Sequence, residues 1–208
     1  MPLTPAAPVR QLSLFSVEAV APAPTDLAGL LAGPGRLDRM GGTARVTVPV
    51  DAAWRVHALI PELVLRGFTA SWSPIATAAP DNLDETTGDG FEVRTAYSSR
   101  LSGLGRAWLD GTAKRPPERF FLSGPRLRLW AVAAGSMHPG GYQLGLGPDD
   151  TGHGWEIVDA ALTRAGVPGV VLEPVAAYRI TGRRRLARLA ELVGERPAAA
   201  PAEHWPGG

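Results

Sequence analysis

The chain has 208 residues, and its 25 glycines and 20 prolines make about a fifth of the positions turn or linker residues. Hydrophobic residues make up 45% and charged residues 20%, which excludes a wholly disordered or collagen-like chain and fits one or two small globular units. The absence of cysteine excludes disulfides, thiolate nucleophiles and cysteine zinc sites, while a net charge of +1 does not by itself indicate nucleic-acid binding. No stretch is apolar enough to span a membrane and no signal peptide is recognisable, so we expect a cytoplasmic protein.

Two segments rich in alanine and proline lie at the ends of the chain. Residues 1–24 and residues 195–208 bury too little apolar surface to offset the entropy of an ordered chain. We therefore expect both segments to be flexible tails. The folded part lies between them.

The first tail contains the pentapeptide Gln11-Leu12-Ser13-Leu14-Phe15. It resembles the motif by which bacterial proteins bind the β sliding clamp. In that interpretation Leu14 and Phe15 fill an apolar pocket, Leu12 adds apolar contact, and the amide of Gln11 sets the orientation. The alternative is an edge strand or an apolar anchor onto the protein's own body.

The folded part can be laid over itself with an offset of one hundred residues. LAGLLAGPG starts at Leu27 and LRLWAVAAG starts at Leu127, so that Gly35 aligns with Gly135. Each copy predicts a helix, a strand pair, a second helix, a second strand pair and a third helix. The predicted boundaries are 25–111 for the first repeat, 112–126 for a linker and 127–194 for the second repeat.

Local patterns support the predicted elements. Ala44, Val46, Val48 and Val50 alternate with polar residues, as in a strand with one buried face. Apolar helical patterns run from residue 51 to Gly67, with a kink or break expected at Pro61, and from residue 154 to Gly166. For the third helices we predict N-caps at Ser98 and Thr181 and stops at Gly111 and Gly194.

The repeat resembles the LAGLIDADG homing-endonuclease family in its single-chain form, over about residues 25–194. The match rests on Leu27, Ala28, Gly29, Leu30 and Gly35, and the second copy keeps mainly the ends and the apolar character. The resemblance implies an α+β fold with two pseudo-symmetric α-β-β-α-β-β-α repeats, whose antiparallel sheets form a saddle over double-stranded DNA. It also implies a monomer that imitates a dimer, with the motif helices packed through small residues.

The family cuts DNA with metals held by an acidic residue at the eighth position of each motif. Here these positions hold Pro34 and Ala134, which cannot bind a metal. Asp38 and His138 follow four residues later, and we interpret them as turn residues in preference to substitute ligands. We therefore expect no nuclease activity, no metal and no cofactor. The chain is similar in this respect to the WhiA-type actinobacterial regulators of the family, which have lost the acids.

The small net charge conceals two basic blocks. Residues 94–128 contain eight basic and two acidic residues, and residues 179–188 contain five arginines and no acid. Because arginine pairs with phosphate and with guanine edges, a set of arginines is predicted to bind DNA: Arg45, Arg94, Arg100, Arg179, Arg183, Arg184 and Arg185. The alternative for each is a solvated side chain.

These features together predict a non-catalytic, nucleoid-associated DNA-binding protein that the sliding clamp recruits to sites of replication or repair. The tail would raise the effective concentration of the DNA-binding body at the clamp. The alternatives are a divergent metal-dependent endonuclease that uses Asp38, and a transcriptional regulator of the WhiA type.

Overall fold

The computed structural model describes residues 21–75, 90–147, 154–173 and 176–207, and it contains the predicted repeat. The first repeat comprises η1 (Pro24–Leu27), α1 (Ala28–Ala32), β1 (Arg36–Met40), β2 (Thr43–Val50), α2 (Ala53–Leu65), β3 (Ala70–Pro74), β4 (Phe91–Thr95), η2 (Ser99–Leu101) and α3 (Ser102–Trp108). The second repeat comprises α4 (Gly124–Ala134), β7 (Gly135–His138), β8 (Gly141–Gly145), α5 (Trp155–Arg164), β9 (Val170–Leu172), β10 (Ala177–Ile180) and α6 (Arg183–Val193). The predicted α+β class and element order are confirmed. The pentapeptide 11–15 lies outside the described residues.

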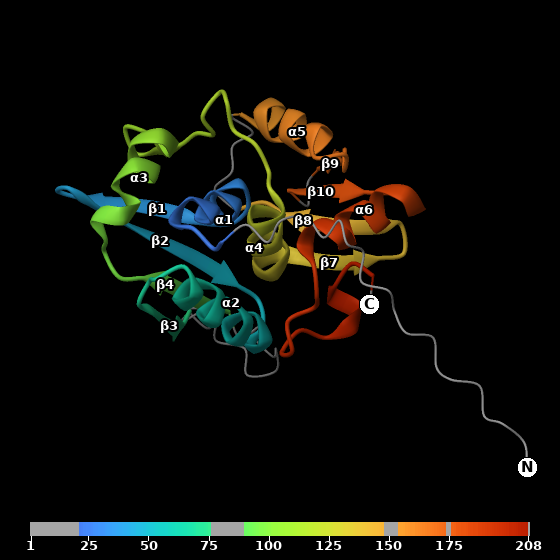
Figure 1. Cartoon of the computed structure of the whole chain (residues 1–208), viewed down its shortest axis with the longest axis horizontal. Coiled ribbons are helices and arrows are strands. Elements are labelled where there is room, and N and C mark those ends of the chain that lie inside the picture. The colour runs from blue at the N-terminus through green and yellow to red at the C-terminus, as the bar shows by residue number, and fades with distance from the viewer. Residues whose placement is uncertain (1–20, 76–89, 148–153, 174–175, 208) are drawn as a thin grey trace, which may run out of the picture.

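Each repeat forms one four-stranded antiparallel sheet with the same topology. The strand order is β1-β2-β4-β3 in the first sheet and β7-β8-β10-β9 in the second. A small hairpin, β5 (Leu109–Asp110) and β6 (Ala113–Lys114), lies between the repeats. In Figure 1 the helices α1 and α4 lie side by side at the centre, with one sheet extending to each side of them.

The alternation predicted for residues 43–50 is confirmed in β2. Ala44, Val46, Val48 and Val50 are buried in the core, together with apolar residues of α2 such as Val56 and Leu59. We call the opposite side of each sheet, which faces away from the helices, its outer face. In β2 the polar residues that alternate with these apolar ones, Thr43, Arg45 and Thr47, lie on the outer face.

The two motif helices approach closely because of small residues, as the resemblance implies. A β-carbon on Gly29 of α1 would stand 1.9 Å from the carbonyl oxygen of Arg126 in α4, so that only glycine fits. Gly33 makes room in the same way for the ring of Trp130. Trp130 is fully buried, and its indole donates to the carbonyl of Gly145 at 2.8 Å. The ring of Trp130 thus fills the space that the missing side chain of Gly33 leaves.

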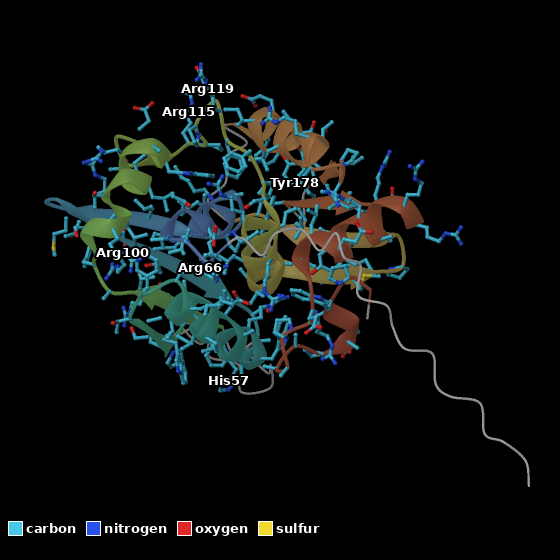
Figure 2. All side chains as sticks on the ribbon, viewed as in Figure 1. His57, Arg66, Arg100, Arg115, Arg119 and Tyr178 are labelled. Atoms are coloured by element: carbon cyan, nitrogen blue, oxygen red, sulfur yellow. The ribbon has the colours of Figure 1, made fainter. Side chains whose placement is uncertain are left out.

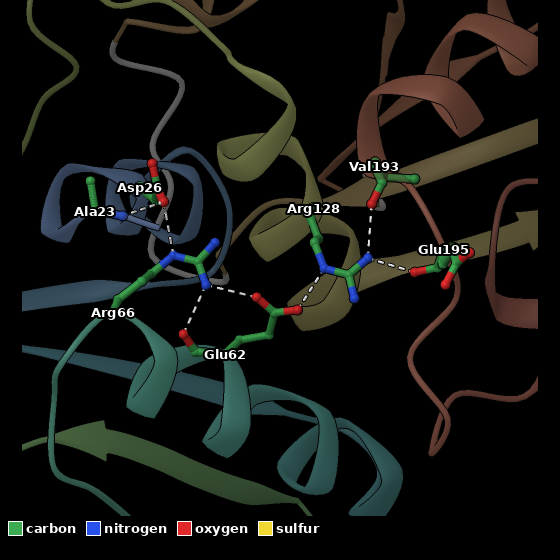
Figure 3. A network of polar contacts seen from close by, with 7 residues as sticks. All are labelled: Ala23, Asp26, Glu62, Arg66, Arg128, Val193 and Glu195. Carbon is green, nitrogen blue, oxygen red and sulfur yellow. Dashed lines mark hydrogen bonds and ion pairs between the residues drawn. The ribbon is translucent and has the colours of Figure 1, made fainter. Parts of the chain in front are cut away.

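A buried ion-pair network joins the repeats on the helix side (Figure 3). Glu62 of α2 accepts from Arg66 at 2.7 Å and from Arg128 of α4 at 2.5 Å. Arg66 also donates to Asp26 at 3.0 Å, and Arg128 reaches the carbonyls of Val193 and Glu195. Burial favours the neutral form of Glu62, but the hydrogen bonds from Arg128 and Arg66 outweigh it and hold the pKa of this carboxyl below its ordinary value.

The expectation of a second flexible tail at residues 195–208 is wrong for residues 195–207. The indole of Trp205 is 2% exposed and donates to the carbonyl of Gly194 at 3.0 Å. A short helical turn, η3 (Ala202–His204), precedes it, and Arg128 lies over its ring at 5.4 Å. One large aromatic side chain supplies the buried surface that the surrounding alanines and prolines lack. The segment is part of the folded body.

Four local expectations can be compared with the helix ends. Ser98 caps its helix as predicted by accepting from the backbone of Arg100, and Gly194 ends α6. Thr181 is not the N-cap, since Gly182 takes that position without a side-chain cap. The helix expected to run to Gly111 ends at Trp108, because residues 109–114 pair as a hairpin.

The other departures concern α2 and α4. Helix α2 continues through Pro61, because buried Leu63 and the ion pairs of Glu62 and Arg66 hold its last turn. Helix α4 begins at Gly124, three residues inside the expected linker.

Of the helices in the described part of the chain, none has both the length and the apolar character needed to cross a membrane.

Candidate nucleic-acid interface

A row of polar side chains crosses the outer face of the first sheet. The strand register places Arg36 of β1 beside Thr47 of β2, Thr47 beside Arg94 of β4, and Arg94 beside Ser71 of β3. Residues in register on neighbouring strands point to the same face, so these four side chains form one line. We call this line the first row.

The second sheet carries an equivalent row. Ser136 of β7 lies beside Gln143 of β8, Gln143 beside Arg179 of β10, and Arg179 beside Val170 of β9. Arg94 and Arg179 therefore occupy the same register position of the same strand in the two repeats. The structure thus places two of the predicted DNA-binding arginines at pseudo-symmetric positions.

Arg45 also lies on the outer face of the first sheet, because it is two residues from Thr47 in strand β2. Its guanidinium donates to Asp38 of β1 at 2.9 Å and lies 4.7 Å from the centre of the Tyr97 ring. The hydrogen bond to Asp38 raises the pKa of Arg45, so the group is positioned and permanently charged. Asp38 was interpreted as a turn residue, but it lies in strand β1, where it orients this arginine.

The outer faces hold buried polar atoms that have no hydrogen-bond partner among the described residues. These are Nε of Arg45, Oγ1 of Thr47 and Nε of Arg179. Leaving such a group unsatisfied costs about 1–3 kcal/mol, and most buried polar groups in folded proteins are satisfied. A ligand that offers hydrogen-bonding groups along both rows would satisfy these atoms. Among described residues the one further atom of this kind, Nδ1 of His204, lines the pocket between the sheets.

The remaining predicted arginines lie elsewhere. Arg100 donates to the carbonyl of Gly67 at 3.0 Å and lies over the ring of Phe68, so it contacts the turn after α2 and does not join the rows. Arg183, Arg184 and Arg185 are exposed on the first turn of α6. This turn follows β10 directly, which places the three charges beyond the end of the strand that carries Arg179.

Basic side chains occupy the ends of both motif helices. Lys114 of β6 donates to the carbonyl of Gly33 at 2.8 Å, just before Pro34. Arg55 of α2 donates to the carbonyls of Val132 and Gly135 at 3.0 Å each, on either side of Ala134. A fixed positive charge therefore lies beside each position where the resemblance would require an acidic metal ligand.

The two residues considered as substitute metal ligands, Asp38 and His138, both lie in strands. Asp38 pairs with Arg45, and His138 is the last residue of β7, not the turn residue that we expected. The described residues contain no group of three or more histidine, aspartate or glutamate side chains that could hold a metal ion. A cation would also meet the charges of Lys114 and Arg55 at the helix ends.

A pocket of about 550 Å³ opens where the two sheets meet. Its lining combines outer-face residues of both sheets with the motif-helix ends: Pro34, Pro49, Val50, Asp51, Arg55, Ala133, Ala134, Ser136, Met137, His138, Gly145 and His204. The three guanidinium nitrogens of Arg55 donate to Asp51 at 2.6 Å and to the two carbonyls of α4 described above. The pocket thus lies between the first and second rows.

Several residues of this surface were not predicted from the sequence. Arg36 could have been found, because it alternates with buried Leu37 in the same way as the residues of β2. Gln143 and Ser136 lie in a strand pair for which the sequence gives a weaker alternation. The contacts of Arg55 and Lys114 join residues about 80 positions apart, and no local pattern reveals them.

The fold is of the LAGLIDADG type, with two repeats in one chain. The chain is similar to the homing endonuclease I-WcaI in a complex with its DNA recognition sequence, with a TM-score of 0.59, 9% identity, and coverage of 81% of this chain and 78% of that one. It is also similar to the N-terminal LAGLIDADG domain of DUF199/WhiA, with a TM-score of 0.53, 14% identity, and coverage of 84% and 82%. No protein-family model and no curated protein matches the chain.

Proposed function

We propose that this chain is a non-catalytic protein that binds double-stranded DNA with the outer faces of its two sheets. The observation that carries the proposal is the pair of equivalent rows centred on Arg94 and Arg179, with unsatisfied polar atoms at Arg45, Thr47 and Arg179. Arginine donates in pairs to phosphates and to base edges, and both rows face the same partner if DNA lies across them. The fold that the chain shares with a DNA-bound homing endonuclease supports this use of the surface.

A fluorescence-anisotropy titration with labelled duplex DNA tests the proposal. We expect Arg94→Gln and Arg179→Gln to weaken binding by similar factors, about tenfold each, because the two residues are equivalent. The affinity of the wild type should fall steeply with salt, and the slope should decrease in both variants. Arg100→Gln is the matched control, because it removes the same charge from a side chain that contacts Gly67. A loss in the control as large as in the row variants would contradict the proposed surface.

Absence of cleavage is the second part of the proposal. Pro34 and Ala134 cannot bind metal, and Lys114 and Arg55 bring positive charge to both helix ends. Incubation with plasmid and magnesium or manganese should therefore give no nicking. Metal-dependent nicking that Asp38→Ala abolishes would support the alternative, a divergent endonuclease.

Recruitment to replication or repair sites by the β sliding clamp is the third part. It rests on the pentapeptide 11–15, which matches the clamp-binding pattern at every position. The first described residues lead into η1, which contacts both motif helices. Binding of both the clamp and a duplex raises the effective concentration of each contact.

A pull-down of the clamp with the full chain tests this recruitment. Leu14→Ala with Phe15→Ala should abolish capture, while a scrambled order of residues 2–8 serves as a control within the same segment. Unchanged capture by the double variant would contradict the clamp-binding interpretation.

The likeness to the WhiA domain favours one alternative, a transcriptional regulator. Chromatin mapping that finds fixed promoter sites without dependence on replication would support that alternative.

A further inference from the structure

The pocket between the rows has the position of a base-binding site. Pro49 of β2 and Ser136 of β7 line it, and both belong to strands that carry the rows on the outer faces. Its remaining lining comes from the ends of the motif helices and from the C-terminal segment. A duplex that lies across both rows would therefore pass over Pro49 and Ser136 of this lining.

The chemistry of the pocket does not suit a phosphate. All three nitrogens of the Arg55 guanidinium already donate to acceptors of the chain. The carboxylate of Asp51 is 76% exposed and presents negative charge at the rim, which repels a phosphodiester. A neutral group that donates hydrogen bonds to this carboxylate fits better.

The shape and walls suit a flat ring. Pro34, Ala133 and Ala134 supply an apolar lining, and the imidazole of His204 lies 5.5 Å from the ring of Trp54. The buried Nδ1 of His204 has no partner among the described residues, so it can bond a polar ring edge. The volume of about 550 Å³ lies within the range of pockets that hold small ligands. Extruded nucleobases are held by this combination of apolar walls and a few polar groups.

We propose that the pocket accepts one unpaired nucleobase with an exocyclic amine (adenine, cytosine or guanine) from duplex DNA bound to the outer faces. The proposal rests on the DNA-binding function proposed above. The amine donates to Asp51, and His204 bonds the ring edge. Extrusion costs least for a base that lacks a pairing partner. The protein therefore prefers a duplex with an unpaired adenine to the fully paired duplex.

The test compares three duplexes by fluorescence anisotropy: fully paired, with one unpaired adenine, and with one unpaired thymine. We expect the duplex with unpaired adenine to bind about tenfold more tightly than the paired one, and the thymine duplex to gain less because it offers no amine. With 2-aminopurine at the unpaired position, fluorescence should rise on binding as the base leaves the stack. A preference that is absent, or equal for thymine and adenine, overturns the proposal.

Two variants separate the pocket from the general flexibility of bulged DNA. Ala134→Leu narrows the pocket and should remove the preference for the duplex with unpaired adenine. Asp51→Asn keeps an oxygen for Arg55 and should reduce the discrimination of adenine from thymine, which tests the proposal even if Ala134→Leu does not fold. A preference that persists in both variants overturns the base-binding site alone. Failure of the wild type to bind any duplex overturns the proposed function and this inference together.

Discussion

The two repeats share one topology but use their arginines differently. In the first repeat Arg55 and Arg66 are buried with acceptors of the chain, and Arg45 and Arg100 are held by neighbouring groups. In the second repeat Arg183, Arg184 and Arg185 extend from the first turn of α6, and Figure 2 shows long basic side chains projecting from the molecule near this end. Arg94 and Arg179 correspond in both position and face. Charge counted along the sequence therefore overstates the basic surface of the first repeat.

The internal arginines of the first repeat brace the second. Helix α2 contacts α4 at its C-terminal end through Arg55 and along its side through Glu62 and Arg128. The end of α1 is held by Lys114, which comes from the hairpin between the repeats. The first repeat thus supplies side chains that bond to helix α4 of the second repeat and to the residue after it.

Replacing Arg55 is the strongest way to break this brace. Arg55→Met leaves the carbonyls of Val132 and Gly135 and the carboxylate of Asp51 without this donor, and we expect the free energy of unfolding to fall by roughly 3–5 kcal/mol. Urea denaturation measures the loss. Arg106→Met is the control, because Arg106 is exposed on α3, and it should cost less than about 0.5 kcal/mol. Equal losses in the two variants would show that Arg55 braces nothing.

The stability that the ion pairs of Glu62 with Arg66 and Arg128 contribute should be lost at acidic pH. Glu62→Gln removes the charge that Arg66 and Arg128 share, with an expected loss of roughly 2 kcal/mol at neutral pH. Because the pKa of Glu62 is lowered in the folded state, its contribution is complete above the ordinary carboxyl pKa of about 4.3 and is lost as the pH falls through the folded value.

Unfolding curves at a series of pH values measure this contribution. The difference in stability between the wild type and Glu62→Gln should shrink as the pH is lowered below about 4. Glu191→Gln is the control, because Glu191 forms an exposed pair with Arg188 and should contribute under about 0.5 kcal/mol at every pH. A Glu62→Gln difference that does not change with pH would contradict the linkage.

The elements of the fold could be predicted from the sequence because their signals are local. The alternation of residues 44–50 and the offset of one hundred residues between the motif helices are visible without any tertiary information. The C-terminal segment could not be predicted in this way. Trp205 is a single aromatic residue among alanines and prolines, and its place against Gly194 depends on a surface made by distant residues.

The candidate site could be predicted only in part. Arg45, Arg94 and Arg179 were recognised as strand arginines, but their rows depend on strand register, which no sequence pattern here specifies. Arg100 belongs to the basic block of residues 94–128, but its guanidinium donates to the carbonyl of Gly67. The pocket brings together residues from 34 to 204, so no local sequence pattern indicates it.

Replacing Lys114 at the end of α1 should have a smaller effect on stability than replacing Arg55 at the end of α4. Lys114 is less buried than Arg55, and it donates to the carbonyl of Gly33 at 2.8 Å and to that of Gly35 at 3.4 Å. Lys114→Met should lower the free energy of unfolding by about 1 kcal/mol, less than Arg55→Met. Lys114→Arg keeps a donor and is the matched control. A loss as large as that of Arg55→Met would mean that both helix ends depend equally on their cations.

Replacing an arginine in the first turn of α6 should have the smallest effect on stability. It also separates a contribution to stability from a contribution to DNA binding. The N-terminus of a helix carries partial positive charge, so Arg183, Arg184 and Arg185 are unfavourable there for the isolated fold. Arg184→Gln should therefore raise the free energy of unfolding by about 0.3–1 kcal/mol. The same change should weaken binding to duplex DNA at low salt if the turn contacts phosphates. Arg188→Gln, farther along the helix and paired with Glu191, should not increase stability. A variant that gains stability while it loses affinity would show that these charges are retained for a partner and not for the fold.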